Sequence, residues 1–205
     1  MSEGMPIQTA VLASGNKGKL EELNLLLAPT KFQLFPQSKY EINPASETGA
    51  SFVENALIKA RHASRLTSLP AFADDSGLVV PSLDGAPGIY SARYAGPAAS
   101  SQHNNLKLLE ALGNSPSRRA YFFCTLVFLL HKQDPTPIVV SGEWHGKIAE
   151  EARGDNGFGY DPIFVADEFQ ITAAQMEPEL KNRLSHRAIA AVNLIRSIQH
   201  RQGQK

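Results

Sequence analysis

Residues 7–27 read IQTAVLASGNKGKLEELNLLL, and this stretch decides the fold. Its apolar run ends at Ala13 and is cut off by turn residues, which predicts a short buried strand. Beyond the loop SGNKGK, Leu20, Leu23, Leu26 and Leu27 recur at helical spacing, and polar residues occupy the other side. A strand that runs through a short loop into a helix is expected of an α/β protein.

Later segments carry similar signals. Ser51 to Glu54 has the form of a capping box. The helix that it opens should place on one face Phe52, Ala56, Ala60 and Ala63. A short strand at 71–73 and another at 78–80 should flank Asp74-Asp75-Ser76-Gly77, which would put two carboxylates at a strand junction.

The second half predicts one helix, several strands and a closing helix. The helix uses the spacing of Leu106, Leu109 and Leu112 before Gly113. Strands at 121–130 and 137–140, joined by a turn, should pair antiparallel, with another strand near 147–149. The closing helix should have Ser185 as its N-cap and an apolar stripe of Ile189, Val192 and Ile195.

Composition excludes several classes of protein. With 205 residues, 42% of them hydrophobic, the chain is long enough for one domain, simple or two-lobed. Lys plus Arg equals Asp plus Glu at 20 each, so there is no general positive field for nucleic acid or an anionic membrane. The single cysteine, Cys124, is expected to be buried, and it excludes an intrachain disulfide.

The distribution of apolar residues predicts a cytoplasmic protein. The N-terminal MSEGMPIQ lacks the basic flank and apolar core of a signal peptide. The apolar run at 121–130 is about half the length that spans a bilayer. We therefore expect neither a membrane nor a nucleic acid as a partner.

The loop from Ser14 to Lys19 is a candidate phosphate site. Unpaired N–H groups at a helix start and the helix dipole favour an anion, and Lys17 and Lys19 add positive charge. The spacing is not that of a Walker A loop. The alternative is an ordinary strand-to-helix turn with solvated lysines.

The acidic residues suggest a metal site. A carboxylate at Asp74-Asp75 suits Mg²⁺, which takes oxygen ligands, and can also orient or deprotonate water. Because strand side chains alternate, only one of the two should face a given cleft. Glu54 is explained by its capping box, which leaves Glu47 as the better second ligand. Alternatively, these are solvated acids of turns and surface loops.

Two further groups could recognise a planar base. Lys181, His186 and Arg187 cluster near the start of the last helix, where cations oppose the macrodipole unless a ligand compensates. Phe158 and Tyr160, with Asp161, lie in the glycine-rich loop 154–162 and offer an aromatic platform. The alternatives are a surface basic cluster and rings that fill the core beneath the loop.

Five segments follow in a fixed order from near residue 10 to near residue 190: ASGNKGKLEEL, SETGASFVENALIKARHAS, AFADDSGLVVPSLDGAPGIYSARYAG, GFGYDPIF and LSHRA. Together they resemble the Ham1 family of inosine triphosphate pyrophosphatases, in particular the bacterial members that act on non-canonical purine nucleotides. The resemblance implies an elongated α/β fold with a mixed central sheet, two lobes around a cleft, and a homodimer. The whole chain, residues 1–205, would be one two-lobed domain.

The same resemblance implies the reaction and the site. The enzyme would hydrolyse inosine, deoxyinosine and xanthosine triphosphates to the monophosphate and pyrophosphate with Mg²⁺. Asp75 would be the base and a metal ligand, with Glu47 as second ligand. The residues that hold substrate would be Ser14, Gly15, Asn16, Lys17, Gly18, Lys19, Ser76, Phe158, Gly159, Tyr160, Asp161, Lys181, His186 and Arg187.

Two other functions fit parts of the sequence. A related house-cleaning pyrophosphatase of the Maf type would share the general fold and prefer other modified nucleotides. A non-catalytic nucleotide sensor could use the same phosphate loop. Base preference separates the first alternative from the Ham1 reading, and release of pyrophosphate separates the second.

Overall fold

The computed structural model describes residues 7–203, except for the side chain of Lys17. Its strands are β1 (Gln8–Leu12), β2 (Phe32–Pro36), β3 (Ala71–Val79), β4 (Arg119–Leu129), β5 (Ile138–Ile148) and β6 (Phe164–Ala166). They form one sheet in the order β2-β1-β3-β4-β5-β6. β1 is parallel to both β2 and β3, whereas β5 and β6 are antiparallel. The predicted α/β fold with a mixed sheet is confirmed.

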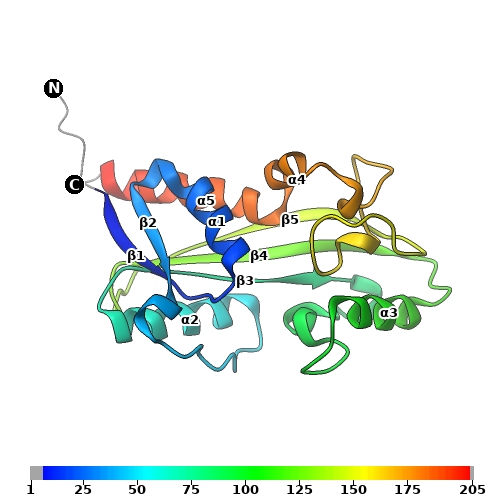
Figure 1. Cartoon of the computed structure of the whole chain (residues 1–205), viewed down its shortest axis with the longest axis horizontal. Helices are drawn as coiled ribbons and strands as arrows, with labels where there is room; N and C mark the ends of the chain where they lie inside the picture. Colours follow the sequence, from blue (N-terminus) through cyan, green and yellow to red (C-terminus); the bar gives the residue numbers. More distant parts are fainter. Residues whose placement is uncertain (1–6, 204–205) are drawn as a thin grey trace. The chain divides into compact units, whose positions relative to one another are not determined.

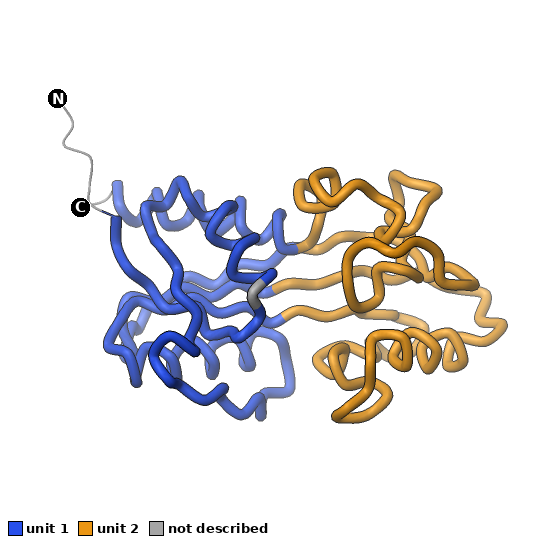
Figure 2. The backbone as a smooth tube through the Cα atoms, in the orientation of Figure 1, with its two compact units in different colours: residues 1–75, 125–142, 187–205 blue, residues 76–124, 143–186 orange. Residues whose placement is uncertain are grey.

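The chain divides into two compact units (Figure 2). Unit 1 comprises residues 1–75, 125–142 and 187–205, and unit 2 comprises residues 76–124 and 143–186. Within the described range, no helix is both long and apolar enough to cross a membrane.

Unit 1 has a helical layer on each side of its strands (Figure 1). On one side, α2 (Phe52–Thr67) packs Ala56, Ala60 and Ala63 against β1, β3 and β4, as the alanine spacing predicts. The other side carries a cluster of Phe32, Phe72 and Phe128, whose ring centroids lie 4.6 to 5.4 Å apart. There α1 (Lys17–Leu27) and α5 (His186–Gly203) cover the strands.

Unit 2 has its own hydrophobic core. α3 (Ser101–Leu112) contributes Leu108 and Leu112, and β5 contributes Trp144. The loop after β5 and the short helix α4 (Pro178–Leu184) complete the unit. The helix predicted before Gly113 is present, but Leu106 is exposed and Leu108 is buried in its place.

Three of the sequence predictions are wrong in detail. β3 runs without a break through Asp74 to Gly77, so the two carboxylates lie inside a strand and not at a junction. β5 is likewise one strand where two were expected. The predicted stripe of α5 is also wrong, because Ile189 and Val192 are exposed while Ala190, Ala191, Leu194 and Ile198 are buried. The buried face of α5 therefore combines two small alanines with the larger Leu194 and Ile198.

Candidate active site

The loop between β1 and α1 has the geometry of an anion site. Asn16 is the N-cap of α1, and its side-chain oxygen accepts a hydrogen bond from the Lys19 N–H at 3.1 Å. The Ser14 hydroxyl accepts from the Asn16 N–H at 3.2 Å. Gly15 and Gly18 are exposed. The loop therefore presents the first turn of a helix, where N–H groups and the dipole favour negative charge.

A cavity of about 200 Å³ in unit 1 opens beside this loop. It is lined by Ala13, Ser14, Gly15, Lys19, Gln37, Pro44, Ala45, Glu47, Lys59 and Asp74. It therefore brings together Ser14, Gly15 and Lys19 of the predicted phosphate loop and the predicted metal ligand Glu47. The prediction for Lys17 concerns a side chain that lies outside the described part of the chain.

Lys59 is a functional candidate that sequence reasoning missed. Its Nζ donates to Asp75 Oδ1 at 2.6 Å and to Glu47 Oε1 at 2.8 Å. Asn55, one helical turn earlier on α2, lies with its Nδ2 3.5 Å from Asp75 Oδ2. Because Asn55 and Lys59 directly precede the buried Ala56 and Ala60, the periodicity of α2 was a signal that could have placed both beside the sheet.

Asp75 is buried, and its electrostatic environment differs from that of Asp74. Burial raises the pKa of its carboxyl group, and the nearby Glu47 and Asp74 raise it further, although the ammonium of Lys59 pulls it down. The net direction is upward. A carboxyl group with a raised pKa is suited to accept a proton from water.

Asp74 is fully buried and is held by cations. Lys19 Nζ donates to its Oδ2 at 2.7 Å, and Arg187 Nε lies 4.0 Å from the same oxygen. Burial alone raises the pKa of Asp74, but Lys19, Arg187 and Lys59 outweigh it, so the pKa lies well below its usual range. Two adjacent carboxyl groups whose environments push their pKa values apart indicate two different roles.

Arg187 belongs to unit 1 and is buried. Its Nη1 donates to Glu22 Oε2 on α1 at 2.6 Å, so the guanidinium lies between the carboxylates of Glu22 and Asp74. Glu22 is itself partly buried. The role of Arg187 in holding the base stays a prediction.

The residues predicted to hold the base lie mostly in unit 2. Asp161 is buried, and its Oδ2 accepts from the Phe158 N–H at 2.7 Å and from Lys181 Nζ. Lys181 Nζ also lies 4.7 Å from the centroid of the ring of Phe158, a residue that is 59% exposed. Phe158, Asp161 and Lys181 thus form one cluster with an open aromatic face.

Tyr160, in the same loop as Phe158 and Asp161, packs into the hydrophobic core of unit 2. Its side chain is buried in the core of unit 2, and its hydroxyl donates to the Ser91 carbonyl at 2.8 Å. Burial raises the pKa of the hydroxyl. The interpretation that at least one ring of the loop fills the core is confirmed.

Three further predicted substrate-binding residues, His186, Ser76 and Gly159, also lie in unit 2. His186 is buried, and its ring stacks on Phe122 with centroids 4.9 Å apart and planes 13° apart. Ser76 is half-buried and follows Asp75 in β3. Gly159 adopts a left-handed conformation with φ of 64°.

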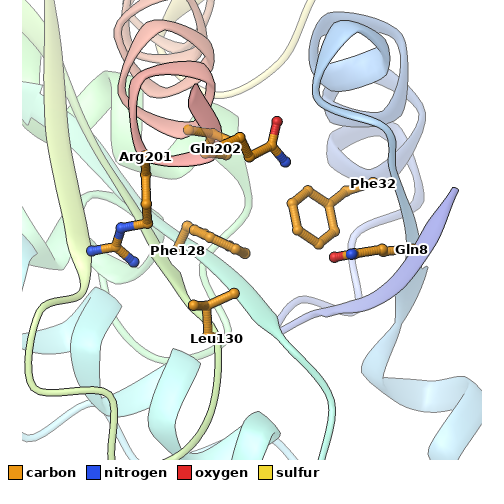
Figure 3. A pocket seen from close by; sticks show the side chains of 7 residues that line it. Gln8, Phe32, Phe128, Leu130, Arg201 and Gln202 are labelled. Atoms are coloured by element: carbon orange, nitrogen blue, oxygen red, sulfur yellow. The ribbon is translucent and has the colours of Figure 1, made fainter. Parts of the chain in front are cut away.

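A second cavity of unit 1, of about 110 Å³, has a different character (Figure 3). Phe32, Phe128 and Leu130 line it, and the guanidinium of Arg201 points away from Phe32. Arg201 instead donates to the Thr136 carbonyl and lies 3.5 Å from Asp134. This cavity therefore offers apolar surface and no charged group directed at a phosphate.

The first cavity suits a divalent cation. Glu47 and Asp74 line it together with Lys19 and Lys59, and Lys59 also contacts Asp75. Glu47 and Asp75 converge on one ammonium and so already share a cationic neighbour. Magnesium sites commonly use one or two carboxylates and complete the shell with water and substrate phosphates.

Comparisons with known proteins find relatives that match most of the chain. A sequence model of the Ham1 family matches residues 10–197. A protein named dITP/XTP pyrophosphatase from Xanthomonas oryzae pv. oryzae is 54% identical over 90% of this chain and 94% of its own length. One of the same name from Shewanella oneidensis is 52% identical over 95% and 96%.

Solved structures show the same fold. A HAM1 protein from Coxiella burnetii matches with a TM-score of 0.90 and 45% identity, covering 94% of this chain and 99% of that one. The Ham1 protein of Staphylococcus aureus matches with a TM-score of 0.85 and 39% identity, covering 97% and 100%.

Proposed function

This chain belongs to the Ham1 family, and we propose that it is a Mg²⁺-dependent pyrophosphatase of non-canonical purine nucleotides. Its substrates are dITP, ITP and XTP, and its products are the monophosphate and pyrophosphate. The names of its relatives support the substrate class. Enzymes of this type clear the nucleotide pool of damaged purines.

One observation carries the proposal: the carboxylates of Asp75 and Glu47 meet at Lys59, in a unit whose cavity also holds Lys19 and the phosphate loop. Glu47 and Asp75 would hold the metal ion, which when bound neutralises polyphosphate charge. Lys19, Lys59 and the N–H groups at the start of α1 face the same space and would bind the phosphates.

The chemistry then needs one oriented water. Asp75, with its raised pKa, takes the proton as the water oxygen attacks the α-phosphorus. The bond between the α-phosphorus and the bridging oxygen breaks, and pyrophosphate leaves with the electron pair. Lys19 and the loop stabilise the negative charge that develops on the leaving group.

Base selection is assigned to hydrogen-bond donors. Hypoxanthine and xanthine offer a 6-oxo acceptor where adenine carries a 6-amino donor. The exposed ring of Phe158 would stack on the base, and Lys181, held by Asp161, would donate to the oxo group. Gly159, His186 and Arg187 complete the proposed contacts to the base, Ser76 contacts another part of the substrate, and Tyr160 holds the loop through the core of unit 2.

A pyrophosphate-release assay over a panel of dITP, XTP, ITP, GTP and ATP tests the function. A site built around a required hydrogen bond discriminates by up to about 10⁴-fold, so kcat/KM for dITP and XTP should far exceed that for ATP. Equal rates on ITP and ATP would refute the house-cleaning role. A nucleotide sensor would bind but release no pyrophosphate, and a Maf-type enzyme would prefer other modified nucleotides.

Alanine variants refine the base assignment. Lys181→Ala and Arg187→Ala should each narrow the ratio of kcat/KM between ITP and ATP, because the 6-oxo group loses a donor. An unchanged ratio in either variant removes that residue from base recognition. The homodimer and the cytoplasmic location implied by the family resemblance belong to the same proposal, and light scattering tests the former.

A further inference from the structure

The ammonium of Lys59 occupies the point where two carboxylates meet. It lies 2.6 Å from Asp75 Oδ1 and 2.8 Å from Glu47 Oε1. All three side chains are partly enclosed, with 14% of Lys59, 11% of Asp75 and 29% of Glu47 exposed. Both carboxylates therefore direct an oxygen at a single positive charge.

We propose that Lys59 holds the place of the divalent cation in the metal-free protein and is displaced from Glu47 and Asp75 when the metal binds. The inference rests on the proposed function in one respect only, namely that this carboxylate pair is the metal site. Lys59 is then a positioning residue whose contacts differ between the two states.

The two cations compete for the same lone pairs. Magnesium binds carboxylate oxygens at about 2.0–2.1 Å and tolerates little distortion of its shell. An ammonium at hydrogen-bond distance from the same Asp75 oxygen would stand next to the ion, where two positive charges repel in a partly enclosed site. Lys59 must therefore move for the ion to take both carboxylates.

The Lys59 side chain can turn into the cavity when it leaves the two carboxylates. Its side chain lines the same cavity as Ser14, Gly15 and Lys19. A cation that arrives with a nucleotide brings phosphate oxygens into that cavity, so the displaced ammonium gains a new anionic partner. Free metal offers no such partner, and the protein should therefore bind metal weakly by itself and strongly as the metal–nucleotide complex.

In the metal-free protein, the ammonium of Lys59 reduces the repulsion between the carboxylates of the site. Asp74, Asp75 and Glu47 would otherwise crowd negative charge around one strand, and like charges at close range destabilise each other. Lys59 supplies the compensating charge on the Asp75 side, as Lys19 does on the Asp74 side. The site therefore keeps its geometry before the substrate arrives.

The first test measures Mn²⁺ binding without nucleotide. The electron paramagnetic resonance signal of the free ion reports how much Mn²⁺ is bound. Lys59→Met should bind Mn²⁺ about tenfold or more tightly than the wild type, because the competing charge is gone. Lys59→Arg keeps the charge and should bind no more tightly than the wild type. Lys132→Met, which removes an exposed lysine of the same unit, is the matched control and should stay within about twofold.

A second readout uses the wild-type protein and so depends on no variant. A brief pulse of acetic anhydride, read by mass spectrometry, should label the Lys59 amine several-fold faster once Mn²⁺ is added, because the amine leaves its carboxylates. A purely structural ion pair would keep its label rate. Each of three outcomes would overturn the inference. These are an unchanged labelling rate of Lys59, Mn²⁺ binding by Lys59→Met that is no tighter than that of the wild type, and Mn²⁺ binding that is undetectable in both proteins.

The outcome is separable from that of the proposed function. Pyrophosphate release from dITP together with unchanged labelling of Lys59 would overturn the placeholder role alone. Tighter Mn²⁺ binding by Lys59→Met together with metal-dependent labelling would support the placeholder role even if the nucleotide panel showed no pyrophosphate release.

Discussion

Replacing Gly157 by alanine should disrupt the base cluster of unit 2. Gly157 has φ of 76°, and a methyl group there would overlap Asp161 Oδ2 and lie 3.1 Å from Lys181 Nζ. Asp161 would have to move, although its carboxylate accepts from both the Phe158 N–H and Lys181. The change therefore acts on a buried acid and its two partners.

Gly159 supplies a control with the same backbone strain. Its φ is 64°, and a methyl group there meets nothing within 4 Å. In either position an alanine in the left-handed region costs about 1–2 kcal/mol. Only Gly157→Ala also loses the contacts of Asp161, where hydrogen bonds to charged groups contribute about 1.5–3 kcal/mol each. Loss of both contacts would make the two variants differ by about 3–6 kcal/mol in their free energies of unfolding.

Urea unfolding followed by tryptophan fluorescence measures this difference. The chain has one tryptophan, Trp144, and it is buried in the core of unit 2. Gly157→Ala should also reduce discrimination between ITP and ATP, since Lys181 loses its anchor. If the two alanine variants unfold at the same urea concentration, the close approach of Gly157 to Asp161 does not contribute to stability, and the predicted difference is refuted.

Three further variants test unit 1. Asp75→Asn should abolish pyrophosphate release while circular dichroism shows a folded protein, and retention of most of kcat at saturating Mg²⁺ would disprove its role as base. Lys19→Ala should weaken ITP and GTP hydrolysis alike, whereas a loss for only one base would move Lys19 out of the phosphate site. The pKa of Asp74 is depressed by folding, so this group stabilises the protein above about pH 4 and loses that effect as the pH falls. Asp74→Asn should therefore flatten the acid limb of the stability profile and reduce turnover less than Asp75→Asn.

Features set by neighbouring residues could be predicted from the sequence. The strand, loop and helix at the start of the chain are present, and Asn16 caps the helix as part of the loop. Ser51 caps α2 by accepting from the Glu54 N–H, and its hydroxyl donates to the Glu54 carboxylate. These signals depend on contacts within about four residues, so the sequence contains them completely.

The continuity of β3 could not be predicted in this way. Two adjacent acids followed by Ser-Gly are typical of a turn, and burying them in a strand is costly without partners. The partners are Lys19, Lys59 and Arg187, which are distant in the sequence. Only the tertiary fold shows that the charges are compensated. In that fold Asp74 and Asp75 belong to the strand β3, and not to a loop.

The alternation of β3 explains why two adjacent acids have different partners. Ala71 and Ala73 pack on the alanine face of α2, and Asp75 continues that face, where it meets Asn55 and Lys59 of α2. Asp74, one residue earlier, shares the opposite face with the helices α1 and α5, which supply Lys19 and Arg187. Because the side-chain period of a strand is two, each acid is assigned to one helical layer. A slip of one residue would exchange the partners, so the register of β3 separates the acid that contacts Lys19 and Arg187 from the acid that contacts Lys59, which we propose acts on water.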